Sequence, residues 1–231
     1  MPVGAYCRNY NAAKREECGE GLQEGLDHAV DCPCGPLRTL RHEELADVWG
    51  DIMEETGAAV RRELYVQEIS SPQHEAWLDV AAYGVPELAG LLFDVTVRHP
   101  RAARYMPAAA NVDGEAVQRA DTEKHEKYPA RSGYRIVTLG HETWGRLGEP
   151  AEETLSLCAA VANRRDHRRG RIPGDRLRRR RASLDGALQR CVARQLVAAA
   201  FGFHGKASSR RGVVDMTAPE AQGSRAPRWR T

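Results

Sequence analysis

The stretch Leu91-Leu-Phe-Asp-Val-Thr-Val97 decides the fold, because it is apolar at almost every position. Such a run predicts a buried strand in the centre of a sheet. A second strand is predicted over Trp77–Tyr83, and the segment that joins the two, Gly84-Val-Pro-Glu-Leu-Ala-Gly90, has glycine at both ends and proline inside. This arrangement is typical of a hairpin, so we expect the two strands to pair antiparallel.

A helix and a third strand are predicted before this hairpin. The helix has one apolar face, made by Leu45, Val48, Trp49, Ile52, Met53 and Thr56. Thr39 is its expected N-cap and Gly57 its expected C-cap. The strand is predicted over Ala59–Val66, where β-branched residues are fewer.

Beyond the hairpin, His99–Asp113 is predicted to be a loop, Gly114–Tyr128 a polar helix and Tyr134–Leu139 a strand. A last helix is predicted from Gly148-Glu-Pro150, since proline suits the first turn of a helix. The resulting order is helix, three strands, helix, strand, helix (αβββαβα). It predicts an α/β fold with a mixed four-stranded sheet flanked by helices.

Bulk composition is that of a globular protein, with 42% hydrophobic and 29% charged residues in 231. No apolar run approaches the roughly 18 residues that a membrane span needs. The first residues lack the charged and then apolar pattern of a signal peptide. We therefore expect a soluble intracellular protein that has no membrane partner and no small-molecule cofactor.

Positive charge is concentrated in residues 163–181, which hold ten arginines and two acidic residues although the net charge of the chain is only +2. Guanidinium groups suit phosphate, so this run predicts contact with DNA or a nuclear address. The alternative is a solvated basic segment. The expected nucleic-acid-binding residues are Arg164, Arg165, Arg168, Arg169, Arg178, Arg179, Arg180 and Arg181.

Two aspartates lie in the predicted hairpin. Asp79 follows Leu78 in one strand, and Asp94 lies inside the apolar run of the other. If they are directly opposite, both carboxylates face the same side of the sheet and repel each other unless a cation bridges them. Mg²⁺ takes oxygen ligands and keeps several waters, so two carboxylates and a backbone carbonyl suffice to hold it. A slip of one residue would instead put the two side chains on opposite faces.

Two lysines on the helix that follows are candidates for catalysis beside such a metal. Lys124 and Lys127 are three residues apart and therefore share a helix face. A lysine near the metal would orient or deprotonate the attacking water and stabilise charge in the transition state. The alternative is a solvated helix face of mixed charge.

Together, Leu78-Asp-Val, Leu92-Phe-Asp-Val-Thr-Val97 and the helix segment Ala120–Tyr128 resemble the restriction-like endonuclease domain of site-specific non-LTR retrotransposons. That domain belongs to the PD-(D/E)XK nuclease superfamily. The entry to the first helix, Arg41-His42-Glu-Glu-Leu45, and the segment Val137–Gly148 are similar to it as well.

The resemblance implies a restriction-endonuclease-like core, with Asp79 and Asp94 as Mg²⁺ ligands and Lys124 as the catalytic lysine. Lys127 is its close rival. An acidic helper from the first helix or strand is also implied, either Glu44 or Glu63. The chain departs from the family in two ways: Leu78 replaces the proline of the Pro-Asp signature, and the 231 residues contain no reverse transcriptase.

Four of the six cysteines lie in the first 34 residues, which favours metal binding over disulfides. The related nucleases have a Cys-Cys-His-Cys knuckle at this place, and the available ligands here are Cys7, Cys18, His28, Cys32, Cys34 and His42. The predicted zinc ligands are Cys18, His28, Cys32 and Cys34. Cys7 is followed three residues later by Tyr10, so the usual Cys-x-x-Cys start is missing. The alternative is a segment with free thiols. Cys158 and Cys191 lie on apolar helix faces and are expected in the core.

Five segments are predicted. They are a Cys-rich segment (1–36), a nuclease-like core (37–168), an Arg-rich linker (169–182), an amphipathic helix (183–203) and a disordered basic tail (204–231). The expected function is Mg²⁺-dependent cleavage of DNA in the nucleus. The alternatives are an inactive nucleic-acid-binding module and a non-functional remnant of a retroelement.

Overall fold

The computed structural model describes residues 5–22, 25–72, 75–128, 134–172 and 174–202. The predicted tail over 204–231 lies outside these residues. The elements of the fold are therefore those found between residues 5 and 202.

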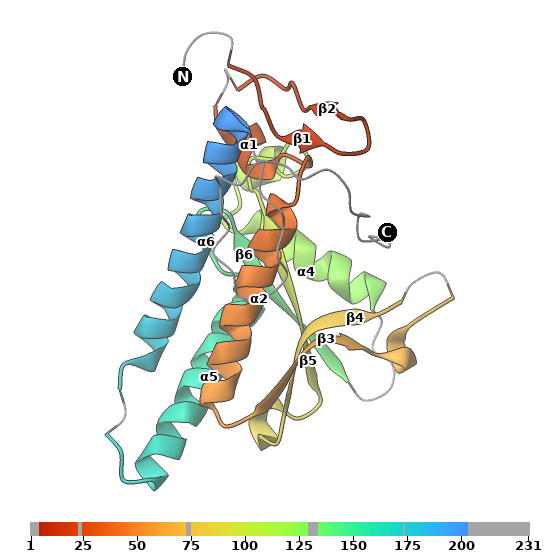
Figure 1. The fold of residues 1–231 in the computed structure, drawn as a ribbon. Coiled ribbons are helices and arrows are strands. Elements are labelled where there is room, and N and C mark those ends of the chain that lie inside the picture. Colours follow the sequence, from red (N-terminus) through yellow and green to blue (C-terminus); the bar gives the residue numbers. More distant parts are fainter. Residues whose placement is uncertain (1–4, 23–24, 73–74, 129–133, 173, 203–231) are drawn as a thin grey trace, which may run out of the picture.

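A mixed four-stranded sheet lies at the centre of the molecule (Figure 1). Its strands are β3 (Ala59–Tyr65), β4 (Trp77–Tyr83), β5 (Leu91–Arg98) and β6 (Arg135–Glu142), in the spatial order β3-β4-β5-β6. The pairs β3–β4 and β4–β5 are antiparallel, and β5–β6 is parallel. The predicted α/β fold with a mixed four-stranded sheet is therefore confirmed.

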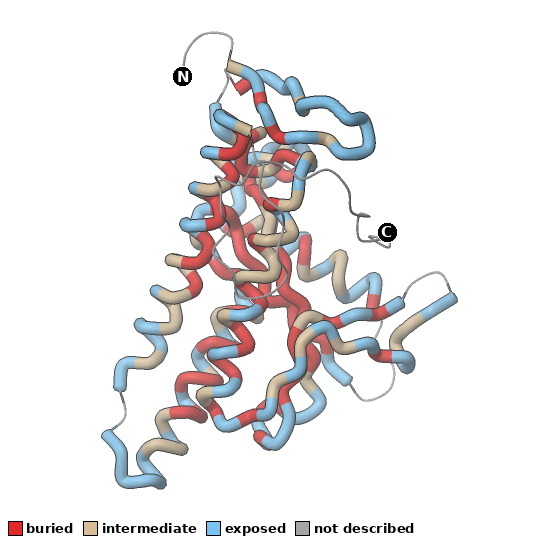
Figure 2. The backbone as a smooth tube through the Cα atoms, in the orientation of Figure 1, coloured by how far each residue is buried: buried red, intermediate tan, exposed pale blue. Residues whose placement is uncertain are grey.

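Three long helices form the layer on one face of this sheet. Helices α2 (Leu37–Glu55) and α5 (Glu149–Arg168) pack on the strands, and α6 (Arg176–Phe201) packs against both helices. The large side chains of Trp49, Phe93 and Leu139 are fully buried in the core between these layers. Figure 2 shows the burial concentrated along the strands and on the inner sides of the helices.

The opposite face of the sheet is covered by α4 (Glu115–Lys127), which follows the short helix α3 (Met106–Ala109). Helix α4 approaches the sheet closely at Gly140, where an added Cβ atom would lie 3.3 Å from Cβ of Val117. Because side chains alternate along a strand, Phe93 and Val95 of β5 face α2 and α5, whereas Asp94 faces α4. The fold thus places Asp94 beneath α4.

The N-terminal residues form a small separate layer at one end of the helices. It contains the hairpin β1 (Tyr10–Asn11) and β2 (Glu16–Glu17) and the short helix α1 (Asp27–Asp31). The end of α6 holds this layer, since the backbone NH of Arg8 donates to the carbonyl of Ala199 at 2.8 Å. A buried contact joins α6 to α1 and α2 as well: the side-chain amide of Gln195 accepts from Arg41 at 2.8 Å and donates to the carbonyl of Val30 at 2.9 Å.

The structure corrects several predicted boundaries. Helix α2 begins at Leu37 after Pro36, two residues before the expected N-cap Thr39. Helix α6 begins at Arg176, so half of the segment predicted to be a linker is helical. Asp175 stabilises this start because its carboxylate accepts from the backbone NH of Arg178. Two 3₁₀ turns, Gln67–Ile69 and Pro86–Leu88, and helix α3 occupy segments predicted as connections.

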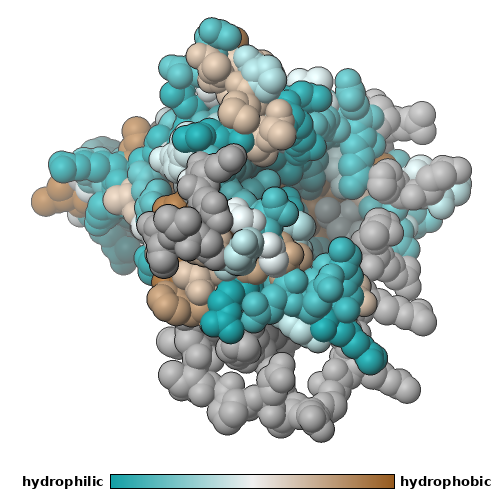
Figure 3. Space-filling view, turned by 90° about the horizontal axis from the view of Figure 1, so that it is seen from above, coloured by the Kyte–Doolittle hydropathy of each residue, from teal (hydrophilic) through white to brown (hydrophobic). Residues whose placement is uncertain are grey.

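Hydrophilic residues cover most of the described surface in the view from above, and hydrophobic residues show there as separate small patches (Figure 3). Among the helices that the structure describes, none combines the length and apolar composition needed to cross a membrane.

Candidate functional site

The register of the central hairpin brings Asp79 and Asp94 together. Val80 pairs with Phe93 and Ala81 with Leu92, so one further step along the ladder puts Asp79 opposite Asp94. The Asp79 carboxylate accepts a hydrogen bond from the backbone NH of Val95 at 2.6 Å, which turns it toward β5. The side chain of Asp94 is only 5% exposed and that of Asp79 is 16% exposed. The two carboxylates therefore belong to one partly enclosed site.

Lys124 enters this site from α4. Its Nζ atom lies 2.6 Å from Oδ2 of Asp94, and its side chain is 21% exposed. Burial raises the pKa of the Asp94 carboxyl above its usual value, although the Lys124 ammonium acts in the opposite direction. The charge of Asp79 contributes to the same rise in the pKa of Asp94. Of the two lysines predicted from the sequence, Lys124 is therefore the one beside the carboxylates.

His42 of α2 is a fourth member of the site, and it was not predicted. Its Nε2 atom lies 3.1 Å from Oδ2 of Asp79 and 3.1 Å from the carbonyl oxygen of Val95. Burial alone would lower the pKa of His42, but the hydrogen bond and charge of Asp79 outweigh it and the pKa is raised. A sequence signal was present, because His42 lies three residues before Leu45 and so on the apolar face of the helix.

The remaining predicted catalytic residues lie elsewhere. Lys127 is exposed, and its Nζ atom lies over the ring of Tyr128, 4.9 Å from the centroid. Glu44 faces α6, where its carboxylate accepts from Arg190 at 3.1 Å and from Arg194 at 2.7 Å. Two arginines on the neighbouring helix thus bind the Glu44 carboxylate, and its predicted catalytic role stays a prediction.

Glu63 is exposed on β3 and has a positive φ of 52°. The ladder with β4 skips this position, since pairing runs from Arg62 with Val80 to Leu64 with Leu78. Asp79 is the residue across from the skipped position. Burial, with a contribution from the charge of Glu63, raises the pKa of the Glu43 carboxyl. The structure thus puts Glu63 on the strand next to Asp79, at the position where the ladder is interrupted.

A second cluster lies in the N-terminal layer, where four potential metal ligands converge. The ligand atoms of Cys7, Cys18, His28 and Cys32 all lie within 4.8 Å of one another. The Cys7 and Cys32 sulfurs are 3.7 Å apart, and Cys18 Sγ is 3.3 Å from His28 Nε2. Zinc–sulfur bonds of about 2.3 Å in a tetrahedron give ligand separations of about 3.8 Å. The cluster could therefore bind a metal such as zinc.

This ligand set differs from the predicted one at a single position. Cys7 takes part, although no Cys-x-x-Cys precedes it, because the backbone around β1 and β2 puts it beside Cys18. The pairing is direct: the NH of Gly19 donates to the carbonyl of Cys7 at 2.9 Å. Cys34 lies outside the set but close to it, and burial raises the pKa of its thiol to about 11, with Cys18 and Cys32 adding to the rise.

The predicted nucleic-acid-binding arginines fall into two groups. Four of them make contacts within the protein: Arg164 with Glu87, Arg165 with the carbonyl of Glu55, Arg180 with Glu55 and Arg181 with Glu152. Among the described residues, the side chains of the other four take part in no ion pair or hydrogen bond; these are Arg168, Arg169, Arg178 and Arg179. The arginine run is thus partly structural.

No protein-family model matches this chain, and no curated protein matches it. The sheet, the acidic pair and the cysteine cluster are therefore the observations from which a function has to be inferred.

Proposed function

We propose that this protein is a Mg²⁺-dependent nuclease that hydrolyses DNA phosphodiester bonds and whose sheet and helices form a restriction-endonuclease-like core. The observation that carries the proposal is the grouping of Asp79, Asp94 and Lys124 from three separate elements. A buried carboxylate with a second carboxylate opposite is costly unless cations balance the charge. The resemblance of the same residues to the endonuclease domain of site-specific retrotransposons supports this reading.

Oxygen donors of the right kind are present for Mg²⁺. The carboxylates of Asp79 and Asp94 and the carbonyl of Val95 would hold the ion, since Mg²⁺ takes oxygen ligands and retains some of its waters. Asp79 and the Val95 carbonyl already converge on one atom, His42 Nε2, at 3.1 Å each. When bound, the ion polarises the phosphate and lowers the pKa of a coordinated water.

The protein side chains then have separate tasks in the hydrolysis. Lys124, next to Asp94, orients the attacking water and stabilises the negative charge that develops on the phosphoryl oxygens. His42 holds the Asp79 carboxylate through its hydrogen bond. The water gives up a proton to solvent as its oxygen forms a bond to phosphorus, one ester P–O bond breaks, and the departing oxygen takes up a proton from solvent.

Supercoiled plasmid tests the proposal. The protein is incubated with plasmid and Mg²⁺, next to the variants Asp94→Ala, Lys124→Ala and Lys127→Ala. We expect nicking by the wild type and Lys127→Ala, and a loss of at least about 100-fold in Asp94→Ala and Lys124→Ala, the range of general acid–base and electrostatic effects. Cleavage that survives in Asp94→Ala would exclude this site as its origin.

A second candidate function is a nucleic-acid-binding module without catalysis. It is favoured by the pairing of both carboxylates inside the protein, Asp79 with His42 and Asp94 with Lys124, which balances charge without a metal. Binding that weakens steeply with salt, together with intact plasmid in Mg²⁺, is the expected result for this function.

We also propose that Cys7, Cys18, His28 and Cys32 hold a structural zinc ion. The supporting observations are the ligand separations and the burial of Cys7 and Cys32. A site closed by four protein ligands serves folding rather than catalysis. Zinc here would tie the two ends of the β1–β2 hairpin, flanked by Cys7 and Cys18, to α1, which contains His28 and is followed by Cys32.

A further inference from the structure

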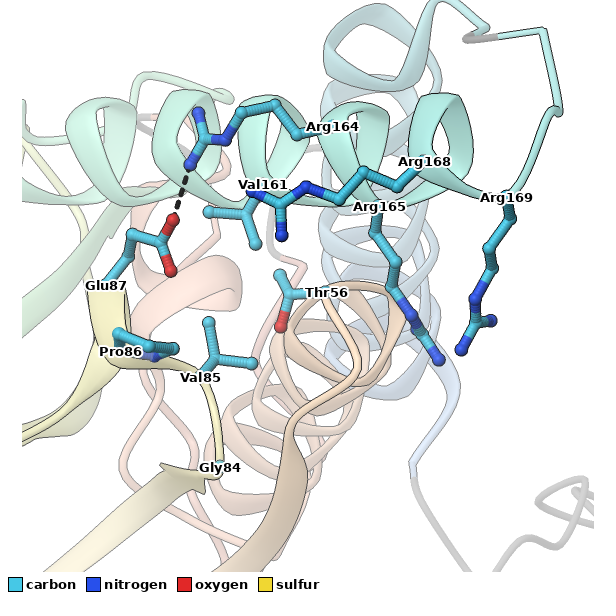
Figure 4. A pocket seen from close by; sticks show the side chains of 10 residues that line it. All are labelled: Thr56, Gly84, Val85, Pro86, Glu87, Val161, Arg164, Arg165, Arg168 and Arg169. Atoms are coloured by element: carbon cyan, nitrogen blue, oxygen red, sulfur yellow. Dashed lines mark hydrogen bonds and ion pairs between the residues drawn. The ribbon is translucent and has the colours of Figure 1, made fainter.

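A pocket of about 270 Å³ lies between the end of α5 and the turn that joins β4 to β5 (Figure 4). Val161 of α5 and Val85 and Pro86 of the turn give it an apolar wall. Gly84, at the entry of this turn, follows Asp79 by five residues of strand, which is about 16 Å at 3.3 Å per residue. The pocket is therefore separate from the acidic pair.

Arginines make up the other wall of this pocket. They come from one helix end and are Arg164, Arg165, Arg168 and Arg169. Positions 164, 165 and 168 are spaced so that their side chains leave the helix on one side. The single carboxylate in the lining belongs to Glu87. Four guanidinium groups against one carboxylate leave the pocket strongly positive.

Two of these arginines are fixed by contacts with the protein. Arg164 pairs with Glu87 at 2.6 Å, and Arg165 donates to the carbonyl of Glu55 at 3.2 Å. Gly57 leaves room for Arg165, because a Cβ atom there would lie 2.9 Å from the guanidinium carbon, and its φ of 96° also favours glycine. The fold thus fixes the guanidinium of Arg165 at the wall of the pocket.

Arg168 and Arg169 have no such contacts within the part of the chain that the structure describes. Figure 4 shows the Arg165 and Arg169 side chains extending from α5 in the same direction, and that of Arg168 running back over the pocket. Each guanidinium is a planar fork with donors for two oxygens of one anion. The two guanidinium groups of Arg168 and Arg169, next to the fixed one of Arg165, suit an anion that has several oxygens.

We propose that this pocket binds a phosphate group carried by a nucleotide, with the attached sugar against Val85, Pro86 and Val161. A volume of about 270 Å³ is close to the lower end of ligand pockets, about 300 Å³, and suits one phosphate and part of its sugar. A terminal phosphate offers these arginines three oxygens and up to two charges, whereas a carboxylate of an acidic peptide offers two oxygens and one charge. The inference does not depend on the proposed hydrolysis, since the pocket lies apart from Asp79 and Asp94.

Fluorescence anisotropy tests the pocket in the full-length protein without added Mg²⁺, so that Mg²⁺-dependent cleavage plays no part and the proposed zinc ion stays in place. The probe is a single-stranded oligonucleotide labelled at its 3′ end. The pocket variant is Arg168→Gln/Arg169→Gln, and the matched control is Arg178→Gln/Arg179→Gln, which removes the same charge from exposed arginines outside the pocket.

We expect the pocket variant to bind at least about tenfold more weakly, the order expected for one lost charge-assisted hydrogen bond. Its slope of log affinity against log salt should fall by about 0.7, since Arg168 and Arg169 share one phosphate and each phosphate contact contributes about 0.7 on single strands. The control variant should lose much less. Equal losses in both variants would show that only total charge matters and would overturn the proposal.

The variant Glu87→Gln gives a test in which binding is expected to become stronger rather than weaker. It removes the carboxylate that competes for Arg164, so phosphate binding should tighten several-fold. Competition then identifies the ligand: a nucleoside monophosphate that displaces the oligonucleotide assigns the pocket to free nucleotides, and displacement by longer strands alone assigns it to the nucleic-acid backbone. Displacement by poly-glutamate at equal charge, or unchanged binding in Glu87→Gln, would contradict the proposal.

Discussion

The ammonium of Lys124 lies 2.6 Å from Oδ2 of Asp94, and the Asp94 side chain is only 5% exposed. One charge comes from α4 and the other from β5, so the ion pair joins a helix to the face of the sheet that it covers. The pair is both a structural contact and the centre of the proposed active site. Variants at either residue therefore report on stability as well as on cleavage.

We expect Lys124→Met to lower the free energy of unfolding by about 2 kcal/mol. This is less than the 3–5 kcal/mol typical of a broken buried pair, because Lys124 keeps some contact with water. Urea denaturation measures the loss. The control Lys127→Met changes an exposed lysine and should stay within about 0.5 kcal/mol. Adding Asp94→Asn to Lys124→Met should restore part of the stability. If the double variant instead loses the sum of the two single losses, the two residues contribute independently.

Acid should destabilise the protein through His141. Burial lowers the pKa of His141 from 6.5 to about 3, and its Nε2 atom accepts from Trp49 Nε1 at 2.9 Å. A lowered folded pKa means that the stability is complete above pH 6.5 and is lost as the pH falls toward 3, by up to about 1.4 kcal/mol per unit.

Denaturation of the wild type and His141→Gln between pH 7 and pH 4 measures this loss. Glutamine still offers Trp49 an acceptor but does not titrate, so the difference in stability between the two proteins should shrink as the pH falls. A constant difference would mean that His141 does not titrate on unfolding in this range.

Zinc content distinguishes the ligand set of the structure from the one predicted from the sequence. We expect about one zinc ion per chain by native mass spectrometry, retained in Cys34→Ser and lost in Cys7→Ser, because Cys7 belongs to the converging set. Cys158→Ser, a change of a buried cysteine in α5, controls for general effects of the substitution. Zinc retained in Cys7→Ser but lost in Cys34→Ser would reverse the assignment.

Gly140→Ala should move α4 away from the sheet. The added methyl group would meet Val117 at 3.3 Å, so the helix has to shift by a few tenths of an ångström, at a cost of about 1 kcal/mol. Cleavage should fall as well, since α4 carries Lys124. Gly186→Ala in α6 is the control, and there alanine should stabilise by about 0.5–1 kcal/mol through helix propensity. Full activity in Gly140→Ala would mean that the position of α4 does not matter.

The elements of the sheet were predictable because their patterns are strong and local. The apolar run around Asp94 and the glycines of the turn after Tyr83 predicted two neighbouring antiparallel strands. Alternation of side chains then predicted that Asp79 and Asp94 could share a site. The register itself needed the structure, since a slip of one residue leaves every local pattern unchanged.

Residues brought together by long-range packing were not predictable in the same way. His42 contacts Asp79 only because α2 crosses the β4–β5 hairpin. Cys7 contacts Cys32 only because the backbone between them folds back on itself. Glu44 was expected near the acidic pair, but a helix that lies about 146 residues later supplies Arg190 as its partner. Arg176 was predicted in a linker but begins α6, where it pairs with Glu55 of α2 and Asp166 of α5.

The contacts between α6 and the N-terminal layer determine which fragments of this chain can keep its core intact. A fragment cut to residues 37–168 would keep the sheet and both carboxylates, but it would leave bare the apolar sides of α2 and α5 that Leu184 and Leu188 now cover. The guanidinium of Arg41 would also lose Gln195 and Val30 inside the protein. We therefore expect the beginning and the end of the described chain to fold as one cooperative unit, so that a stable fragment would have to extend from the cysteine cluster to the last turn of α6.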